Sequence, residues 1–159
     1  MSAIVKVQAY LDEIDSGLKV IALEDDTSTS ELAAQALGVE VGQIAKSLLF
    51  KCKDEFLMIV SAGDVRMDTK LLKNLAGGRV RMASAEETRE VTGYPVGGVC
   101  PFVMANTVPV FLDRSLQRFD VVYAAAGTAN SALPITFEQL VEITGGNPCL
   151  VSIDRNENE

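Results

Sequence analysis

Five segments of the chain show the apolar spacing or the capping pattern of helices, and most of them end at glycine. In the first, Ile4, Val7, Leu11 and Ile14 share one helical face, and this helix is expected to end near Ser16 and Gly17. The other predicted helices span residues 28–38, 67–78, 84–93 and 136–146. The capping-box pattern occurs as Ser28 with Glu31, Ser84 with Glu87, and Thr136 with Gln139.

Strand-like runs alternate with these helices. They cover residues 19–23, 44–51, 56–61, 79–83, 108–112, 120–126 and 149–153. The runs 44–51 and 56–61 flank the sequence CKDE, which predicts a hairpin. Several strands follow one another through connections too short for a crossover helix, so a mixed sheet with flanking helices fits better than an all-parallel one. We expect one α+β domain over residues 1–153 and a flexible tail over residues 154–159.

One strand contains a lysine where an apolar residue is expected. Alternation places Ile44, Lys46, Leu48 and Phe50 on the same face of the strand. A lysine there either lies at an edge and extends its ammonium group into water, or faces a cleft that holds an anion. An unpaired buried ammonium would cost several kcal/mol, so the cleft would need an anionic ligand such as a phosphate.

Charge is unevenly distributed along the 159 residues, whose net charge is −8. Residues 46–82 carry eight basic and four acidic residues, so the remainder is strongly acidic. The acidic total argues against a protein that coats DNA or RNA through phosphate neutralisation. The basic segment is compatible with contacts to a few phosphates of one polyanion, and equally with an ordinary solvated face.

Composition removes several classes of chemistry. The chain has no histidine, which excludes imidazole catalysis and the usual histidine-containing zinc sites. It also has no Walker A pattern and no GxGxxG, so the common sequence motifs of nucleotide-binding sites are missing. Three dispersed cysteines predict neither a disulfide framework nor a thiolate metal site, and we expect no metal and no cofactor. Acidic residues interrupt the first fifteen positions, which argues against a signal peptide and favours the cytoplasm. The uncharged run 91–112 contains prolines and glycines that exclude a membrane helix.

Two loops rich in glycine and small residues are candidates for ligand binding. In GYPVGGVCPF, Gly97 and Pro101 enclose Gly98, Val99 and Cys100. In AAAGTANSALP, the polar or flexible residues are Gly127, Thr128, Asn130 and Ser131. Glycine lets main-chain groups approach a ligand closely, and proline stiffens the end of a loop. Each loop is also compatible with a structural turn, and Cys100 lacks an evident base that would make it a nucleophile.

Three motifs occur in order: IAKSLLFK, TGYPVGGVCPF and AAAGTANSALPITFEQL. Together they resemble the YbaK and prolyl-tRNA synthetase editing-domain family of aminoacyl-tRNA deacylases, over residues 29–146. The resemblance implies a curled, mixed, largely antiparallel sheet flanked by helices, with a cleft for the aminoacylated 3′ end of tRNA. It also implies ester hydrolysis of mischarged tRNA, expected here for proline tRNA that carries a small amino acid.

The resemblance assigns roles to individual residues. Lys46 matches the family lysine that faces the terminal nucleotide, and Gly97 to Pro101 matches the GxxxP loop beside the aminoacyl group. Lys46, Gly97, Gly98 and Pro101 are therefore the expected catalytic residues. The expected substrate-binding residues are Ser47, Val99, Cys100, Gly127, Thr128 and Asn130.

Two departures leave alternatives open. Related sequences carry a Gly-His pair soon after the GxxxP proline, whereas Val103 and Met104 occur here, and basic residues are missing after Gly127. A chain that kept the fold and lost catalysis would bind tRNA or an aminoacyl nucleotide stably, and a purely structural protein would do neither. The expected partners are the aminoacylated 3′ end of tRNA and, transiently, a synthetase, with no DNA and no membrane.

Overall fold

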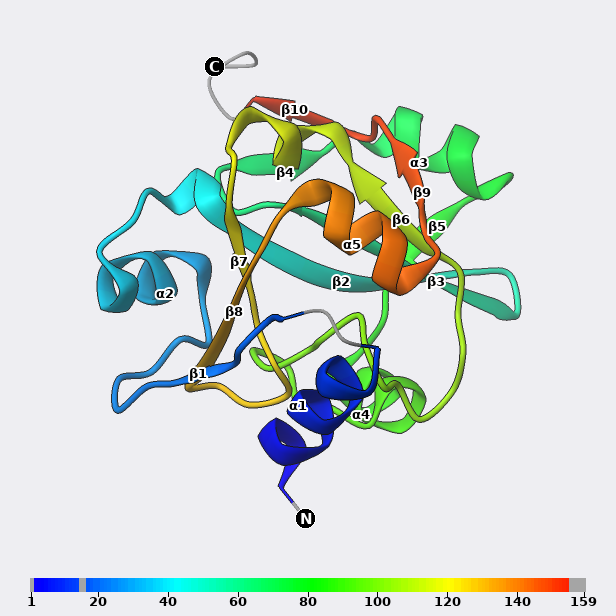
Figure 1. The fold of residues 1–159 in the computed structure, drawn as a ribbon. Helices are drawn as coiled ribbons and strands as arrows, with labels where there is room; N and C mark the ends of the chain where they lie inside the picture. Colours follow the sequence, from blue (N-terminus) through cyan, green and yellow to red (C-terminus); the bar gives the residue numbers. More distant parts are fainter. Residues whose placement is uncertain (1, 15–16, 155–159) are drawn as a thin grey trace.

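The computed structural model describes residues 2–14 and 17–154. These form an eight-stranded sheet and a small two-stranded sheet, with helices around them (Figure 1). The helices are α1 (Ala3–Glu13), α2 (Ser30–Leu37), α3 (Thr69–Ala76), α4 (Ala85–Thr92) and α5 (Phe137–Thr144), and two 3-10 helices are η1 (Val41–Gln43) and η2 (Arg114–Arg118). The strands are β1 (Ile21–Ala22), β2 (Ile44–Cys52), β3 (Glu55–Ala62), β4 (Val65–Met67), β5 (Val80–Met82), β6 (Val110–Asp113), β7 (Val122–Ala124), β8 (Ser131–Ile135), β9 (Asn147–Cys149) and β10 (Ser152–Asp154).

The main sheet is mixed and largely antiparallel, as predicted. Its order is β1-β8-β7-β2-β3-β6-β9, and β5 pairs with β2 outside this path. The pairs β2 with β7, β3 with β6, and β6 with β9 are parallel, whereas the other pairs in the sheet are antiparallel. The predicted hairpin is confirmed: β2 and β3 pair from Ala45 with Ala62 to Cys52 with Glu55.

The two faces of the sheet bury different helices. On one face, Val7 and Leu11 of α1 and Leu140 of α5 join the largest apolar cluster. On the other face, Leu72 of α3 packs with Phe50 and its neighbours. Figure 1 shows α5 in front of the sheet and α2 at its left side, where the helix packs against the start of β2. Helices α1, α2, α3 and α5 thus bury apolar side chains, as amphipathic helices on a sheet do, whereas α4 buries Thr88 and Thr92.

Short capping patterns in the sequence correctly predict where two of the helices begin. The capping boxes of Ser84 with Glu87 and of Thr136 with Gln139 are confirmed. The box predicted at Ser28 is wrong, because the N-cap of α2 is Thr29, whose hydroxyl accepts from the Leu32 amide at 3.1 Å. Helix α1 ends at Glu13, earlier than predicted, and Ser16 lies outside the described residues.

The C-terminal end departs from the sequence prediction. The single strand expected over residues 149–153 is wrong, since β9 ends at Cys149 and β10 begins at Ser152 in the other sheet. Between them, the Val151 amide turns inward and donates to the buried Asp113 carboxylate at 2.8 Å. Of the predicted tail, Asp154 ends β10, and residues 155–159 lie outside the described part of the chain.

Candidate active site

The candidate site lies at a gap in the main sheet. On the edge of β2 opposite β3, β7 pairs with residues 44–45 and β5 pairs with residues 50–52. No strand of the described chain pairs with residues 46–49 on that edge. A cavity of about 250 Å³ opens at this gap, and β2, β5, β7 and β8 all contribute to its wall.

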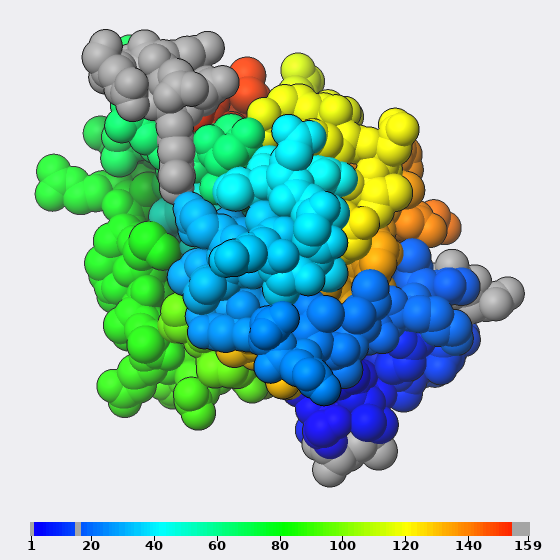
Figure 2. Space-filling model, turned by 90° about the vertical axis from the view of Figure 1, so that its left-hand side faces the viewer, coloured from blue at the N-terminus to red at the C-terminus, as the bar shows by residue number. Residues whose placement is uncertain are grey.

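All three sequence motifs meet at this cavity. Its wall includes Lys46 and Ser47 from the first motif, Gly97 and Val99 from the second, and Ser131 from the third. The N-terminal end of α2 closes another side through the hydroxyl-bearing residues Thr27, Ser28, Thr29 and Ser30. Figure 2 shows this side of the molecule, where the light-blue segment around α2 lies against the green segments. The run TSTS at residues 27–30 is the sequence signal for this wall, although its pattern by itself predicts only the start of a helix.

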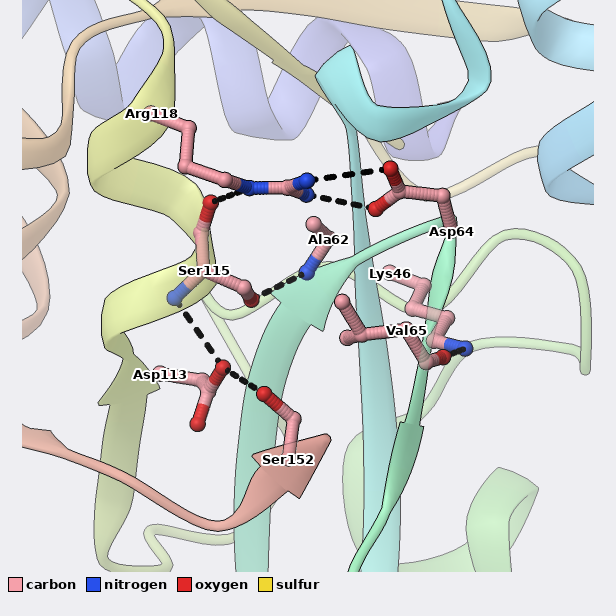
Figure 3. A network of polar contacts seen from close by, with 8 residues as sticks. All are labelled: Lys46, Ala62, Asp64, Val65, Asp113, Ser115, Arg118 and Ser152. Atoms are coloured by element: carbon pink, nitrogen blue, oxygen red, sulfur yellow. Dashed lines mark hydrogen bonds and ion pairs between the residues drawn. The ribbon is translucent and has the colours of Figure 1, made fainter. Parts of the chain in front are cut away.

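Lys46 is the only charged side chain among the described residues that line the cavity. It is half-buried, and its Nζ donates to the carbonyl oxygen of Val65 at 3.0 Å (Figure 3). That acceptor is neutral, so the bond fixes the direction of the ammonium group and leaves its charge uncompensated by that contact. Lys46 thus lines the cavity, while its ammonium group bonds to β4, a strand that does not contribute to the cavity wall.

The turn that carries the Val65 carbonyl is fixed by a polar network that the sequence did not reveal. Asp64 accepts two hydrogen bonds from the Arg118 guanidinium, at 3.1 and 2.5 Å. Arg118 also donates through Nε to the Ser115 carbonyl, and the Ser115 hydroxyl accepts from the Ala62 amide at 3.1 Å. These bonds join the end of β3 to η2, more than fifty residues away in sequence (Figure 3).

Asp113 extends that network into the protein interior, where it bonds to Ser115 and to the segment that leads into β10. Its carboxylate is fully buried and accepts hydrogen bonds from the Ser115 amide at 3.1 Å, the Val151 amide at 2.8 Å and the Ser152 hydroxyl at 2.5 Å. A buried carboxylate is tolerated when hydrogen-bond donors replace its hydration, and three such donors surround this one. Through these hydrogen bonds, Asp113 at the end of β6 is joined to η2 and to β10.

The hydroxyl group of Ser47 is buried and lacks a hydrogen-bond partner among the described residues. The same holds for Ser61, which lies directly opposite Lys46 on β3. Buried hydroxyls are normally satisfied, so both serines are exceptions, and of the two only Ser47 belongs to a residue that lines the cavity.

The glycines of the two loops serve close packing. A Cβ at Gly98 would lie 2.8 to 2.9 Å from the main chain of Thr128, so the two loops touch at this point. Gly97 has φ +92 and lies against Ser28, where an added Cβ would be 2.9 Å from the serine Cβ. Gly127 has φ +99 and packs against Tyr94. These contacts hold the two loops and the α2 segment together around the cavity.

Six of the predicted site residues do not line the cavity, and one of these, Asn130, is exposed. Among the ten, only Lys46, Ser47, Gly97 and Val99 line the cavity; the others are Gly98, Cys100, Pro101, Gly127, Thr128 and Asn130. Cys100 is fully buried, and burial raises the pKa of its thiol to about 12. A thiol of this kind is protonated at neutral pH, which argues against Cys100 as a nucleophile.

The described residues contain no group of three or more His, Cys, Asp or Glu side chains arranged to hold a metal ion. None of the described helices is long and apolar enough to cross a membrane. Among the described residues that line the cavity, the polar side chains are the Lys46 ammonium group and several hydroxyls.

Comparison with known proteins decides the family, because residues 24–143 match the model of the aminoacyl-tRNA editing domain. The chain belongs to the aminoacyl-tRNA editing domain family. It is 42% identical over 126 residues to the uncharacterised YwhH of Bacillus subtilis, covering 79% of this chain and 80% of that protein. EbsC of Enterococcus faecalis, named as a candidate Cys-tRNA(Pro)/Cys-tRNA(Cys) deacylase, is 28% identical over 127 residues, 79% of this chain and 77% of EbsC.

Solved structures of editing-domain proteins share the architecture. One, described as a candidate trans-editing enzyme for prolyl tRNA synthetase, superimposes with a TM-score of 0.89 and 36% sequence identity. The match covers 96% of this chain and 98% of that one. The predicted editing-domain family and fold are both confirmed.

Proposed function

We propose that this chain is a trans-editing aminoacyl-tRNA deacylase that hydrolyses the ester between an amino acid and the 3′ end of a mischarged tRNA. The observation that carries the proposal is Lys46, the single charged side chain described in the wall of a small cavity where three separate motifs meet. Family membership supports the reaction class. The similar structure described for prolyl tRNA synthetase makes proline tRNA the first substrate to test, with a synthetase as the expected transient partner.

The cavity suits a small aminoacyl group. Its volume of about 250 Å³ lies below the range of roughly 300 to 1,000 Å³ that holds drug-sized ligands. Its apolar wall combines alanines with larger side chains such as Leu37, Leu48 and Tyr123. One methylene changes binding by only about 1 to 3 kcal/mol, so a cavity of this limited volume rejects larger amino acids mainly by steric exclusion.

The proposed reaction needs little from the protein beyond orientation. Water attacks the ester carbonyl, a negative charge develops on its oxygen, and the bond to the ribose oxygen breaks to release the amino acid and the free 3′ end. The ester is already activated, and a neighbouring ribose hydroxyl of the substrate can position or deprotonate the water. A chain without histidine can therefore support the step.

Lys46 and Ser47 have separate proposed roles. The Lys46 ammonium, aimed by the Val65 carbonyl, attracts the terminal nucleotide and the developing negative charge. The unpartnered Ser47 hydroxyl donates to the ester group or to the attacking water. Losing one preorganised donor to a developing oxyanion typically costs about 3 to 4 kcal/mol, or about 100- to 1,000-fold in rate.

The test is a deacylation assay with proline tRNA carrying alanine, cysteine and other small residues. We expect ester loss with the wild type, and a kcat/KM about 100- to 1,000-fold lower for Lys46→Ala. Lys70→Ala, which removes an exposed lysine of α3, is the matched control and should retain full activity. Stable binding of these tRNAs without turnover by any folded preparation would reject hydrolysis in favour of a binding module.

A further inference from the structure

We propose that a cationic hollow beside the candidate site binds the phosphate backbone of the RNA whose 3′ end enters the cavity. This inference rests on the proposed function and adds a second contact surface to it. The hollow has a volume of about 290 Å³ and is lined by Lys51, Lys53, Arg79, Val80 and Arg81. Four of its five lining residues are thus basic, in a chain whose net charge is −8.

Strand pairing places these cations together. Lys51 of β2 lies directly opposite Arg81 of β5. Like charges opposite each other in a sheet are destabilising, so this pair needs a compensating group. Glu87 of α4 supplies it, accepting from Arg81 at 2.8 and 2.9 Å and lying 3.7 Å from the Lys51 ammonium. The geometry therefore uses one carboxylate to hold two cations in place.

Two of the four cations remain available to a ligand. Lys53 and Arg79 are exposed, and neither forms a hydrogen bond or an ion pair through its side chain in the part of the chain that the structure describes. Asp54 and Glu55 follow Lys53 in the hairpin turn, but no salt bridge joins them to these two cations in the described chain. An exposed cation without an internal partner is free to contact an external anion.

The hollow continues the candidate site along the same two strands. Arg81 lines the hollow, and the next residues of the chain, Met82 and Ala83, line the cavity. On β2, Lys46 and Lys51 are five residues apart, or roughly 17 Å, and their side chains lie on opposite faces of the strand. Ser47 and Leu49 line the cavity and share the face of Lys51. A polyanion that ends in the cavity can therefore leave it on the Ser47 and Leu49 face and follow β2 and β5 to Lys51 and Arg81.

Phosphates are the anions that fit this arrangement. Cations spaced along a groove and connected to an end-binding cavity are the pattern expected for a nucleic-acid backbone. Contacts of this kind supply affinity and orientation but do not read the base sequence. The net charge of −8 disfavours non-specific binding of a polyanion over the rest of the surface.

The experiment measures binding of an uncharged RNA hairpin that contains an acceptor stem and a single-stranded 3′ end, by fluorescence anisotropy over a series of salt concentrations. The test variant is Lys53→Ala/Arg79→Ala, which leaves the Glu87 network intact. The control is Lys6→Ala/Lys70→Ala, which removes the same charge from α1 and α3. At about 0.1 M salt, losing two phosphate contacts should weaken binding about 25-fold and reduce the salt slope by about 1.4, while the control binds as the wild type does.

The possible results distinguish RNA binding at the hollow from ester hydrolysis in the cavity. Equal loss of affinity in both variants would show a general charge effect and overturn the inference, as would unchanged affinity in the test variant or no RNA binding by the wild type. Hydrolysis is followed separately on an aminoacyl ester of a single nucleoside, which lacks neighbouring phosphates. We expect wild-type rates there for Lys53→Ala/Arg79→Ala, together with a raised KM and an unchanged kcat on full-length tRNA. Reduced hydrolysis of the nucleoside ester would instead show damage to the site itself, and would overturn the inference.

Discussion

Removing the Asp113 carboxylate should destabilise the protein far more than removing an exposed carboxylate in the same network. In Asp113→Ala, the Val151 amide, the Ser152 hydroxyl and the Ser115 amide all lose their acceptor. Val151 is 1% exposed and Ser152 is 9% exposed, so water cannot easily replace the carboxylate there. The matched comparison is Asp64→Ala, which breaks the exposed ion pair with Arg118.

The magnitude follows from the cost of unsatisfied buried donors. Each costs about 1 to 3 kcal/mol, and the Ser115 amide is only partly buried, so we expect Asp113→Ala to lower the free energy of unfolding by about 3 to 5 kcal/mol. Asp113→Asn keeps one acceptor oxygen and should lose about half as much. Exposed ion pairs contribute about 0 to 1 kcal/mol, so Asp64→Ala should lose little.

Urea denaturation followed by circular dichroism measures both effects, since the chain has no tryptophan for fluorescence. With an m-value of about 2 kcal/mol/M, Asp113→Ala should shift the midpoint down by about 1.5 to 2.5 M, and Asp64→Ala by less than about 0.5 M. Equal shifts for the two variants would refute the reasoning, because they would show that burial of the carboxylate does not determine its contribution.

Two further predictions concern the α4 ion pair and the contact between the loops. The hydrogen bonds from Arg81 lower the pKa of Glu87 from 4.5 to about 2, so the stability that this pair provides is present above pH 4.5 and is lost as the pH falls toward 2. The difference in urea midpoint between wild type and Glu87→Gln should shrink over that range, and a difference that stays constant would contradict it. Gly98→Ala places a Cβ against the Thr128 main chain and should cost about 1 to 3 kcal/mol of stability and lower kcat/KM, whereas unchanged deacylation would show that the loop contact does not shape the site.

Sequence reasoning succeeded where the determining contacts are local. Capping boxes join residues three positions apart, which is why Ser84 and Thr136 were identified correctly as helix N-caps. It failed at α2, where adjacent hydroxyl residues offer equivalent local signals. There Ser28 packs against Gly97, and Thr29 caps the helix instead.

Long-range contacts explain the other errors. The break between β9 and β10 depends on a hydrogen bond from Val151 to Asp113, 38 residues earlier in the chain. The orientation of Lys46 depends on a turn held by Arg118, 54 residues from its partner Asp64. A single sequence shows an odd lysine in an apolar strand, but the groups that aim its ammonium are brought together only by the folded sheet.

Because β7 and β5 are both shorter than β2, they leave part of one β2 edge unpaired, and the main-chain groups on that edge make the site polar. The Leu49 carbonyl accepts from the Ala83 amide, so the main chain of Leu49 faces the edge of β2 that β5 covers. Main-chain groups alternate direction along a strand, and those of Ser47 therefore face the same edge, within the gap between β7 and β5. The gap thus presents the Ser47 peptide groups beside its unpartnered hydroxyl and the Lys46 ammonium. Strand ends, rather than a dedicated acid or base, supply the donors and acceptors that an ester substrate would contact.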